Sequence, residues 1–346
     1  MNRFNQAIRR ENPGRPPVWF MRQAGRYHSH YQALKRDHDF MALCKDPALA
    51  CEVTLGPIRD FDFDAAILFS DLLFPLEAMG MGLRYAPGPE LDWHLKSAAD
   101  VARLQGGAER ARGLGFQAEA LRRIRAALPG EKGLLGFVGG PLTLFFYAVA
   151  GSHKGDVSDA VAGVEDGRFE GFCDSLHDLL VANILLQFRA GADTVAVMDT
   201  AAGEIPLESF LRHVVPRLVE LIKEVRSLIP TALFTYYSRH TGPAHWHALK
   251  ELPISCLGVD WEHPLSAVMA EVGDRWAVQG NFDPHLLLLP EAELRPHLDR
   301  FFADALTVSP ERRAGWVCGL GHGVLPGTPE SNVRLFLNLQ RELFAA

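Results

Sequence analysis

Short apolar runs of strand length recur along the chain, and a longer pattern with helical spacing follows most of them. The runs lack the strict alternation of apolar and polar residues that a sheet with one wet face shows. Continuous apolar strands that alternate with helices are typical of a parallel sheet covered by helices. The predicted strands are residues 18–21, 64–70, 133–139, 193–199, 231–236, 255–261, 276–281 and 315–321.

The segments between these runs predict helices. Between 206 and 229 one helical face collects Leu207, Leu211, Val214, Leu218, Leu221 and Val225. Eight strands alternating with helices predict an α/β fold, a single (β/α)₈ TIM barrel that spans residues 1–346 as one domain. An open doubly wound sheet is the alternative. The stretch from 72 to 132, between the second and third predicted strands, is too long for a normal loop and predicts an insertion with its own helix.

Composition narrows the choice of function. The 346 residues suffice to bury a core without a metal ion or disulfide, and fractions of 48% hydrophobic and 22% charged residues are ordinary for a globular enzyme. A net charge of −7 disfavours nucleic acid as a partner. The charged N-terminus lacks the apolar region of a signal peptide, and no apolar run predicts a membrane span. Five cysteines without CxxC spacing favour reduced thiols, so we expect a cytoplasmic protein.

Polar, titratable and glycine residues follow the predicted strands. The strand exits read RQAGR, Ser70-Asp71, GGP, Asp199-Thr200, YYSRH, Asp260-Trp261, Gly280-Asn281 and Gly321-His322-Gly323. Active-site groups of a barrel lie on the loops after the carboxyl ends of its strands, so this clustering indicates an enzyme. Helix N-caps also place Asp, Ser and Thr after strands, and each single Asp or Thr is open to that interpretation.

Arg22 and Arg26 lie four residues apart around Gly25, directly after an apolar run. A guanidinium cannot lose its proton to relieve the repulsion between two such charges. Surface exposure is the ordinary explanation for such a pair. The arginine fork, however, binds carboxylates through two hydrogen bonds, so the pair predicts an anionic ligand with several carboxylates.

Three further residues are candidates for the site. Asp71 ends an apolar run, where a carboxylate either caps the following helix or accepts hydrogen bonds from a ligand. Tyr147 lies in an aromatic run that is more typical of core packing. His322 stands between glycines in GLGHGVLPG, which resembles a phosphate loop only weakly.

Several segments resemble the signature sequences of the uroporphyrinogen decarboxylase family. They are RPPVWFMRQAGRYHSHY, ILFSDLLFPLEAMGMGL, GPLTLFFY, GNFDP and GLGHGVLPGTPESNV, and the resemblance runs from Pro17 to the C-terminal helix. It implies a (β/α)₈ barrel, usually a homodimer, that decarboxylates uroporphyrinogen III in haem biosynthesis without a metal or organic cofactor. The substrate contacts that it implies are Arg22, Gln23, Ala24, Gly25, Arg26, Asp71, Tyr147, Thr200 and His322.

The implied substrate is a tetrapyrrole with four acetate and four propionate groups, and such a polyanion accounts for the two arginines. Loss of CO₂ from an acetate requires an electron sink, and a protonated pyrrole serves as one without a cofactor. Asp71 would accept pyrrole N–H groups and stabilise the cationic intermediate. Arg22 or Arg26 would orient the departing acetate and relay a proton. The implied catalytic residues are therefore Asp71, Arg22 and Arg26.

The chain departs from the family pattern in two loops. Where the family commonly has Asp-Ser-Trp-Ala-Gly, the chain has Ala201 in place of the large side chain, although Thr200 keeps the hydroxyl. The family's Tyr-x-x-Glu-Gly-Gly loses its acid at Ala150. Two alternatives therefore stay open: a paralogue that binds tetrapyrrole without turning it over, and a zinc-dependent corrinoid:thiol methyltransferase. The second needs a His-x-Cys pair as metal ligands, which the sequence lacks.

Overall fold

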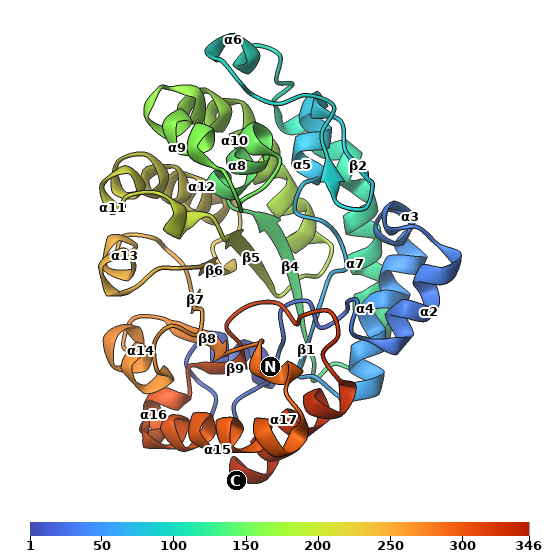
Figure 1. The fold of residues 1–346 in the computed structure, drawn as a ribbon, viewed down its shortest axis with the longest axis vertical. Helices are drawn as coiled ribbons and strands as arrows, with labels where there is room; N and C mark the ends of the chain where they lie inside the picture. The colour runs from blue at the N-terminus through green and yellow to red at the C-terminus, as the bar shows by residue number, and fades with distance from the viewer. Residues whose placement is uncertain (346) are drawn as a thin grey trace.

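A computed structural model describes residues 1–345, and its centre is a curled parallel sheet surrounded by helices (Figure 1). The sheet has seven strands, which lie side by side in chain order. They are β1 (Ala65–Ile67), β4 (Gly133–Gly139), β5 (Thr194–Asp199), β6 (Leu233–Ser238), β7 (Cys256–Gly258), β8 (Ala277–Phe282) and β9 (Trp316–Leu320). The predicted α/β class is confirmed. The doubly wound alternative is wrong, because the strand order of such a sheet reverses at a switch point.

The first predicted strand, residues 18–21, forms only an isolated parallel bridge between Val18 and Cys318. Its backbone lies between β9 and β1. Trp19 N–H donates to the carbonyl of Cys318 at 3.1 Å, and Asp64 N–H donates to the carbonyl of Val18 at 2.9 Å. Pro16 and Pro17 before it have no N–H to add to a ladder. The carboxylate of Asp64 instead accepts the N–H of Val18 at 2.7 Å.

The helices cover the sheet on its outside. They are α1 (Arg3–Ile8), α2 (Ser29–Asp37), α3 (Phe40–Lys45), α4 (Pro47–Phe61), α5 (Phe74–Leu76), α6 (Ala98–Val101), α7 (Gly115–Ala127), α8 (Pro141–Ala150), α9 (Ser158–Glu165), α10 (Arg168–Arg189), α11 (Leu207–Ser209), α12 (Val215–Leu228), α13 (Pro243–Ala248), α14 (Leu265–Val272), α15 (Glu291–Thr307), α16 (Pro310–Arg313) and α17 (Glu330–Leu343). No helix within residues 1–345 is long and apolar enough to cross a membrane.

The helical face predicted between 206 and 229 is buried as expected over α12, where Leu218 and Val225 are inaccessible. Leu211 contradicts the prediction, because it is 46% exposed. The turn Phe210–Val214 is π-helical, and Phe210 takes the buried position instead. Pro216 accounts for this turn, because it has no N–H to donate to the carbonyl four residues earlier.

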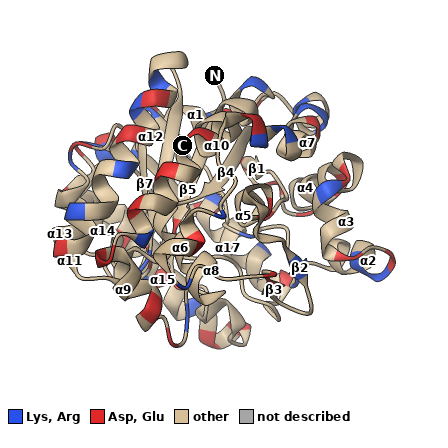
Figure 2. Ribbon diagram, turned by 90° about the horizontal axis from the view of Figure 1, so that it is seen from above, with Lys and Arg blue, Asp and Glu red and all other residues tan. Residues whose placement is uncertain are grey.

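The segment between β1 and β4 contains α5, α6, α7 and a two-stranded antiparallel hairpin of β2 (Arg84–Tyr85) and β3 (Pro89–Glu90). The helix expected in this stretch is α7, which packs against α4. Figure 2 shows Lys and Arg interspersed with Asp and Glu over the helices around the sheet. The hairpin matters for function because it carries Tyr85 toward the loop that follows β1.

Candidate active site

Arg22, the first candidate residue along the chain, has an unusual backbone conformation. Arg22 has φ of 61°, and its side chain lies against Gly323 in the loop after β9. A Cβ atom at position 323 would come within 2.4 Å of Cδ of Arg22, so only glycine leaves room for this side chain. Residues 301 positions apart in the chain therefore meet here. Arg22 is exposed.

The two predicted arginines have different surroundings. The positive charge of Arg22 acts on Asp71, Tyr147 and His322, whereas the charge of Arg26 acts on Tyr31. Both side chains are exposed. The charge of Arg22 thus acts on three of the other candidate residues, and a role for Arg26 stays a prediction.

The residues between the arginines support the loop. The side-chain amide of Gln23 is buried and donates to the carbonyl of Ala65 in β1 at 2.9 Å. The hydroxyl of Tyr27 donates to the carbonyl of Gln23 at 2.8 Å. Ala24 and Gly25 are half-buried. The Gln23 side chain therefore anchors the loop to the sheet, and substrate contact by residues 23–25 stays a prediction.

One carboxylate oxygen of Asp71 accepts a hydrogen bond and the other does not. Oδ1 accepts the backbone N–H of Leu73 at 2.8 Å, so the capping interpretation accounts for this oxygen only. Oδ2 has no hydrogen bond within residues 1–345 and is not sealed from solvent. Burial raises the pKa of Asp71, and the Tyr85 hydroxyl, the Leu73 N–H and the charge of Arg22 oppose that rise. The Tyr85 hydroxyl is buried beside the carboxyl group and has no well-aligned hydrogen bond of its own.

Tyr147 lies near the C-terminal end of α8, and its hydroxyl is 3.0 Å from Nδ1 of His153. Burial and the nearby Asp71 raise the pKa of Tyr147, while Arg22 lowers it. Although most of α8 is core, as its aromatic run suggested, Tyr147 is only half-buried. This side chain therefore belongs to the same group as Asp71 and Arg22.

Thr200 follows β5, where Asp199 fixes the loop. Asp199 is fully buried and accepts the backbone N–H and the hydroxyl of Thr143, both at 3.0 Å, and the hydroxyl of Tyr236 at 3.1 Å. The Thr143 hydroxyl in turn accepts the N–H of Ala201 at 3.0 Å. Ala201 is itself fully buried. These bonds leave Thr200 at the carboxyl end of β5, 8% exposed.

His322 pairs with a tyrosine from β6. Its Nδ1 lies 3.0 Å from the Tyr237 hydroxyl, and the two rings are stacked with centroids 5.9 Å apart. Burial, together with the charges of Arg22, Arg239 and Lys154, lowers the pKa of His322 to about 2. The imidazole is therefore neutral at physiological pH.

Cations are in excess around this cluster. Burial and the charges of Lys154, Arg22 and Arg239 lower the pKa of His153 to about 4. Within residues 1–345, none of these three cations forms an ion pair with a carboxylate. The Nε of Arg239 is buried without an acceptor, and the guanidinium lies over the Trp261 ring at 5.4 Å. Such an arrangement has unused capacity for anions.

Sequence reasoning missed five residues of this cluster: Tyr85, His153, Lys154, Tyr237 and Arg239. The YYSRH strand exit contained two of them, and a systematic test of each strand exit for cations would have found Arg239. The others gave no local signal, because the hairpin and the loop after α8 approach the site only in the folded chain.

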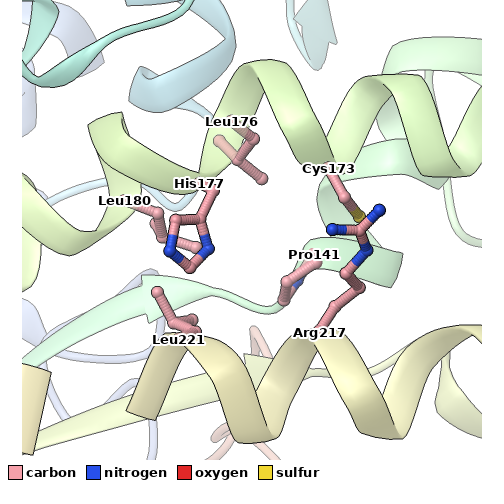
Figure 3. A pocket seen from close by; sticks show the side chains of 7 residues that line it. All are labelled: Pro141, Cys173, Leu176, His177, Leu180, Arg217 and Leu221. Atoms are coloured by element: carbon pink, nitrogen blue, oxygen red, sulfur yellow. The ribbon is translucent and has the colours of Figure 1, made fainter. Parts of the chain in front are cut away.

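Two hollows lie away from this cluster. One of ≈ 10 Å³ sits between α8, α10 and α12, where Cys173, His177 and Arg217 point into it (Figure 3). It holds no more than about one water molecule. The other, of ≈ 300 Å³, lies at the amino ends of β5 and β6 beside Arg9 and Arg189. Neither is at the carboxyl ends of the strands, where barrel enzymes carry their chemistry.

One group of side chains in the described part of the chain is arranged as metal ligands: His240, Asp260 and Glu262. Both oxygens of Asp260 already accept backbone N–H groups, from His240 at 2.6 Å and from Glu262 at 3.1 Å. The group contains no cysteine. It therefore differs from the thiolate set that the methyltransferase alternative requires.

Comparison with known proteins identifies the family. A family model described as "Uroporphyrinogen decarboxylase (URO-D)" matches residues 1–343. The chain belongs to the uroporphyrinogen decarboxylase family. A relative named uroporphyrinogen decarboxylase from Roseiflexus sp. (strain RS-1) is 35% identical over 351 residues, with 99% of each chain covered. Another of that name, from Myxococcus xanthus (strain DK1622), is 36% identical and covers 94% of this chain and 92% of its own.

A solved structure, "methyltransferase from Methanosarcina mazei", matches this fold with a TM-score of 0.78 at 17% identity. The match covers 99% of this chain and 98% of the other. At that identity the likeness concerns the fold alone. The family resemblance predicted from the signature segments is confirmed, whereas the roles of the individual residues are not tested by these comparisons.

Proposed function

We propose that this chain is the enzyme that decarboxylates the four acetate side chains of uroporphyrinogen III to give coproporphyrinogen III in haem and tetrapyrrole biosynthesis. The observation that carries the proposal is family membership over residues 1–343. The site supports it, because cations without carboxylate partners act on His322 and His153, and one of them, Arg22, also acts on Asp71, whose Oδ2 has no hydrogen bond among residues 1–345. The cations can bind the eight carboxylates of the substrate, and the carboxylate of Asp71 can accept hydrogen bonds from its pyrrole N–H groups.

The reaction needs no electron sink beyond the substrate. Protonation of a pyrrole ring carbon creates a cation, the C–C bond to the carboxylate breaks, and its electron pair enters the ring system. The exocyclic carbon then takes a proton to become a methyl group, and the ring carbon loses its own. Each acetate thus consumes one proton and releases one CO₂.

The residues divide this work by charge. The Oδ2 of Asp71 accepts pyrrole N–H groups and compensates the cation. Arg22, for whose side chain Gly323 leaves room, orients the reacting acetate. Tyr147, Thr200 and His322 line the site, and Arg26 contacts carboxylates farther out. Residues 23–25 hold the loop and offer backbone contacts.

The finer architecture is also a proposal. Residues 17–19 bond to Cys318 in β9 and to Asp64, directly before β1, and on this proposal they close the sheet into an eight-membered barrel. The segment from 72 to 132 is an insertion in that barrel, and residues 1–346 form one domain, of which residue 346 lies outside the described part. The protein acts as a homodimer in the cytoplasm, without a metal ion or organic cofactor.

One assay tests this function. The purified protein is incubated with freshly reduced uroporphyrinogen III, with and without prior dialysis against EDTA, and the products are separated by their number of carboxylates. We expect coproporphyrinogen in both samples. Bound but unchanged substrate would support the non-catalytic paralogue, and activity lost on dialysis and restored by zinc would overturn the cofactor-free mechanism.

A further inference from the structure

The backbone that leads to Asp71 leaves the sheet before it reaches the carboxylate. The N–H of Leu68, one residue after β1, still donates to the carbonyl of Leu135 in β4 at 2.9 Å. Among residues 1–345, the backbone of residues 69 and 70 makes one hydrogen bond, from Phe69 N–H to the hydroxyl of Thr54 in α4 at 2.9 Å. The sheet ladder therefore does not fix the direction of the Asp71 side chain, and contacts with other elements must do so.

Two adjacent residues of α7 contact the chain on either side of Asp71. On the side before it, the side-chain amide of Gln117 donates to the hydroxyl of Ser70 at 3.0 Å. On the side after it, the Phe116 ring packs edge-on against Phe74 of α5, with ring centroids 5.1 Å apart. Because α7 also packs against α4, it is a firm support for this loop. The segment between β1 and β4 thus holds the loop that carries Asp71.

Gln117 is an unusual residue for the buried face of α7. Its side chain is 2% exposed, and its Oε1 is buried without a hydrogen-bond partner among residues 1–345. An unpaired polar atom in the interior is destabilising, and the neighbouring buried positions on this helix carry apolar residues such as Leu121 and Ile124. Ser70 is only half-buried, so water could satisfy its hydroxyl without the amide. Folding therefore does not require this hydrogen bond, and its effect lies in where it holds Ser70.

We infer that Gln117 is a positioning residue, which holds Ser70 so that the adjacent Asp71 carboxylate points into the site. The reaction that this serves rests on the proposed function. The carboxylate must lie within hydrogen-bond distance of the pyrrole N–H groups to stabilise the cation, and a displacement of about 1 Å can cost about 10²-fold in rate. Gln117 acts through Ser70 and does not itself touch the substrate.

The first test separates activity from stability. Gln117→Met keeps the length of the side chain and removes its amide. We expect kcat for uroporphyrinogen III to fall at least about tenfold and KM to change less, because the displaced carboxylate stabilises the cation poorly. The melting temperature should stay the same or rise, because an unpaired buried atom is lost. Wild-type kcat in Gln117→Met, or a loss of kcat together with a lower melting temperature, would overturn the inference.

Gln187→Met is the matched control. Gln187 is a buried amide of α10 that donates to the carbonyl of Phe137 in β4 at 2.9 Å, and its Oε1 also lacks a partner among residues 1–345. Phe137 is paired with Ala196 of β5 within the sheet, so its place does not depend on the amide. This variant should keep kcat within about twofold. Equal losses of kcat in Gln117→Met and Gln187→Met would refute a specific role for Gln117.

The second test asks whether Gln117 acts through Ser70. Ser70→Ala leaves the amide donors buried without an acceptor, so the melting temperature and kcat should both fall. In the double variant Ser70→Ala/Gln117→Met the melting temperature should recover, because both partners are then apolar. Its kcat should stay as low as in Gln117→Met alone, since both changes break the same contact. A kcat that recovers with stability, or losses that multiply, would contradict the inference.

The position of Asp71 is measured directly in crystals of the unliganded wild type and of Gln117→Met. We expect the carboxylate to move by about 1 Å or more in the variant while the sheet stays in place. An unmoved carboxylate would refute the positioning role. A wild type without decarboxylase activity, in which Asp71 still moves on Gln117→Met, would refute the proposed function and leave the role of Gln117 intact.

Discussion

Asp71 and Asp199 both come at the end of an apolar run, but the fold uses their carboxylates differently. Asp199 is fully buried and both of its oxygens accept hydrogen bonds from Thr143 and Tyr236. Asp71 is half-buried, and only Oδ1 accepts a bond from a neighbouring backbone N–H. The satisfied carboxylate organises a loop, whereas the unsatisfied one keeps an oxygen for a ligand. A ligand site is therefore recognised by side-chain atoms that lack a hydrogen-bond partner in the protein, as much as by residue type.

The largest expected effect is that of Asp71→Asn. The amide keeps the size and one oxygen but removes the negative charge that opposes the pyrrole cation. Loss of one preorganised electrostatic group costs about 10²–10³ in turnover. The melting temperature should stay the same or rise, because a buried charge without a ligand is costly. Turnover and thermal unfolding are measured on the same preparation, with Asp71→Glu as the variant that keeps the charge. Near-normal turnover in Asn would leave Asp71 as a cap.

Asp199→Asn should affect stability and leave turnover nearly unchanged. Burial raises the pKa of Asp199 to about 6, so the folded state binds its proton more tightly than the unfolded state does. The free energy of unfolding of the wild type therefore falls as pH rises from about 4 to 6. Above that range it falls no further on account of Asp199. At pH 8 the Asn variant should be more stable by about 1–3 kcal/mol, and the difference should vanish below pH 4. Urea unfolding at several pH values measures it. If the Asn variant is less stable at pH 8, the charged carboxylate of Asp199 stabilises the fold through the three hydrogen bonds that it accepts.

Arg22→Lys and Arg26→Lys separate the two arginines. Lysine keeps the charge and accepts the same backbone conformation at 22, but it loses the two-pronged contact with a carboxylate. We expect KM to rise about tenfold for Arg22→Lys and much less for Arg26→Lys, because Arg22 alone acts on Asp71 and His322. Steady-state kinetics at moderate salt compare the pair. Equal losses in both variants would restore the pairwise role that the sequence suggested.

Tyr85→Phe should have the smallest effect. The Tyr85 hydroxyl lies beside Asp71 and lowers the pKa of that carboxyl group. Without the hydroxyl the pKa of Asp71 should rise further, so the acid limb of kcat/KM should move to higher pH with a loss of only a few-fold at pH 7.5. The measurement is a profile of kcat/KM from pH 5 to 8. An unmoved acid limb would show that Tyr85 does not act on Asp71.

Much of the fold was predictable because its signals are local. The apolar runs located seven strands of the sheet, and the helical spacing located α7 and α12. Two details were not predictable from periodicity. Residues 18–21 form a bridge because prolines and the Asp64 side chain replace a ladder, and Leu211 turns outward because a π-helical turn shifts the register.

The candidate site was predictable where a long signature carried it. The signature segments pointed to Arg22, Asp71, Tyr147 and His322, and the structure gathers these four. The Gln23 side chain turns toward β1, and the charge of Arg26 acts on Tyr31, so its contact with substrate stays a prediction. Tyr237 lay in the YYSRH strand exit without a motif of its own, although its hydroxyl is 3.0 Å from Nδ1 of His322 in the folded chain.

The sequence by itself determined the strands, most helices and the family, because side-chain periodicity and signature segments act over short stretches. Only the tertiary structure decided which carboxylate is satisfied. Asp71 and Asp199 look alike in the chain, but the donors that satisfy Asp199 come from residues 37 and 56 positions away. The cations near His322 likewise come from three separate loops. Hydrogen bonds and charge act through distance in space, and that distance is set when the sheet curls and brings the ends of its strands together.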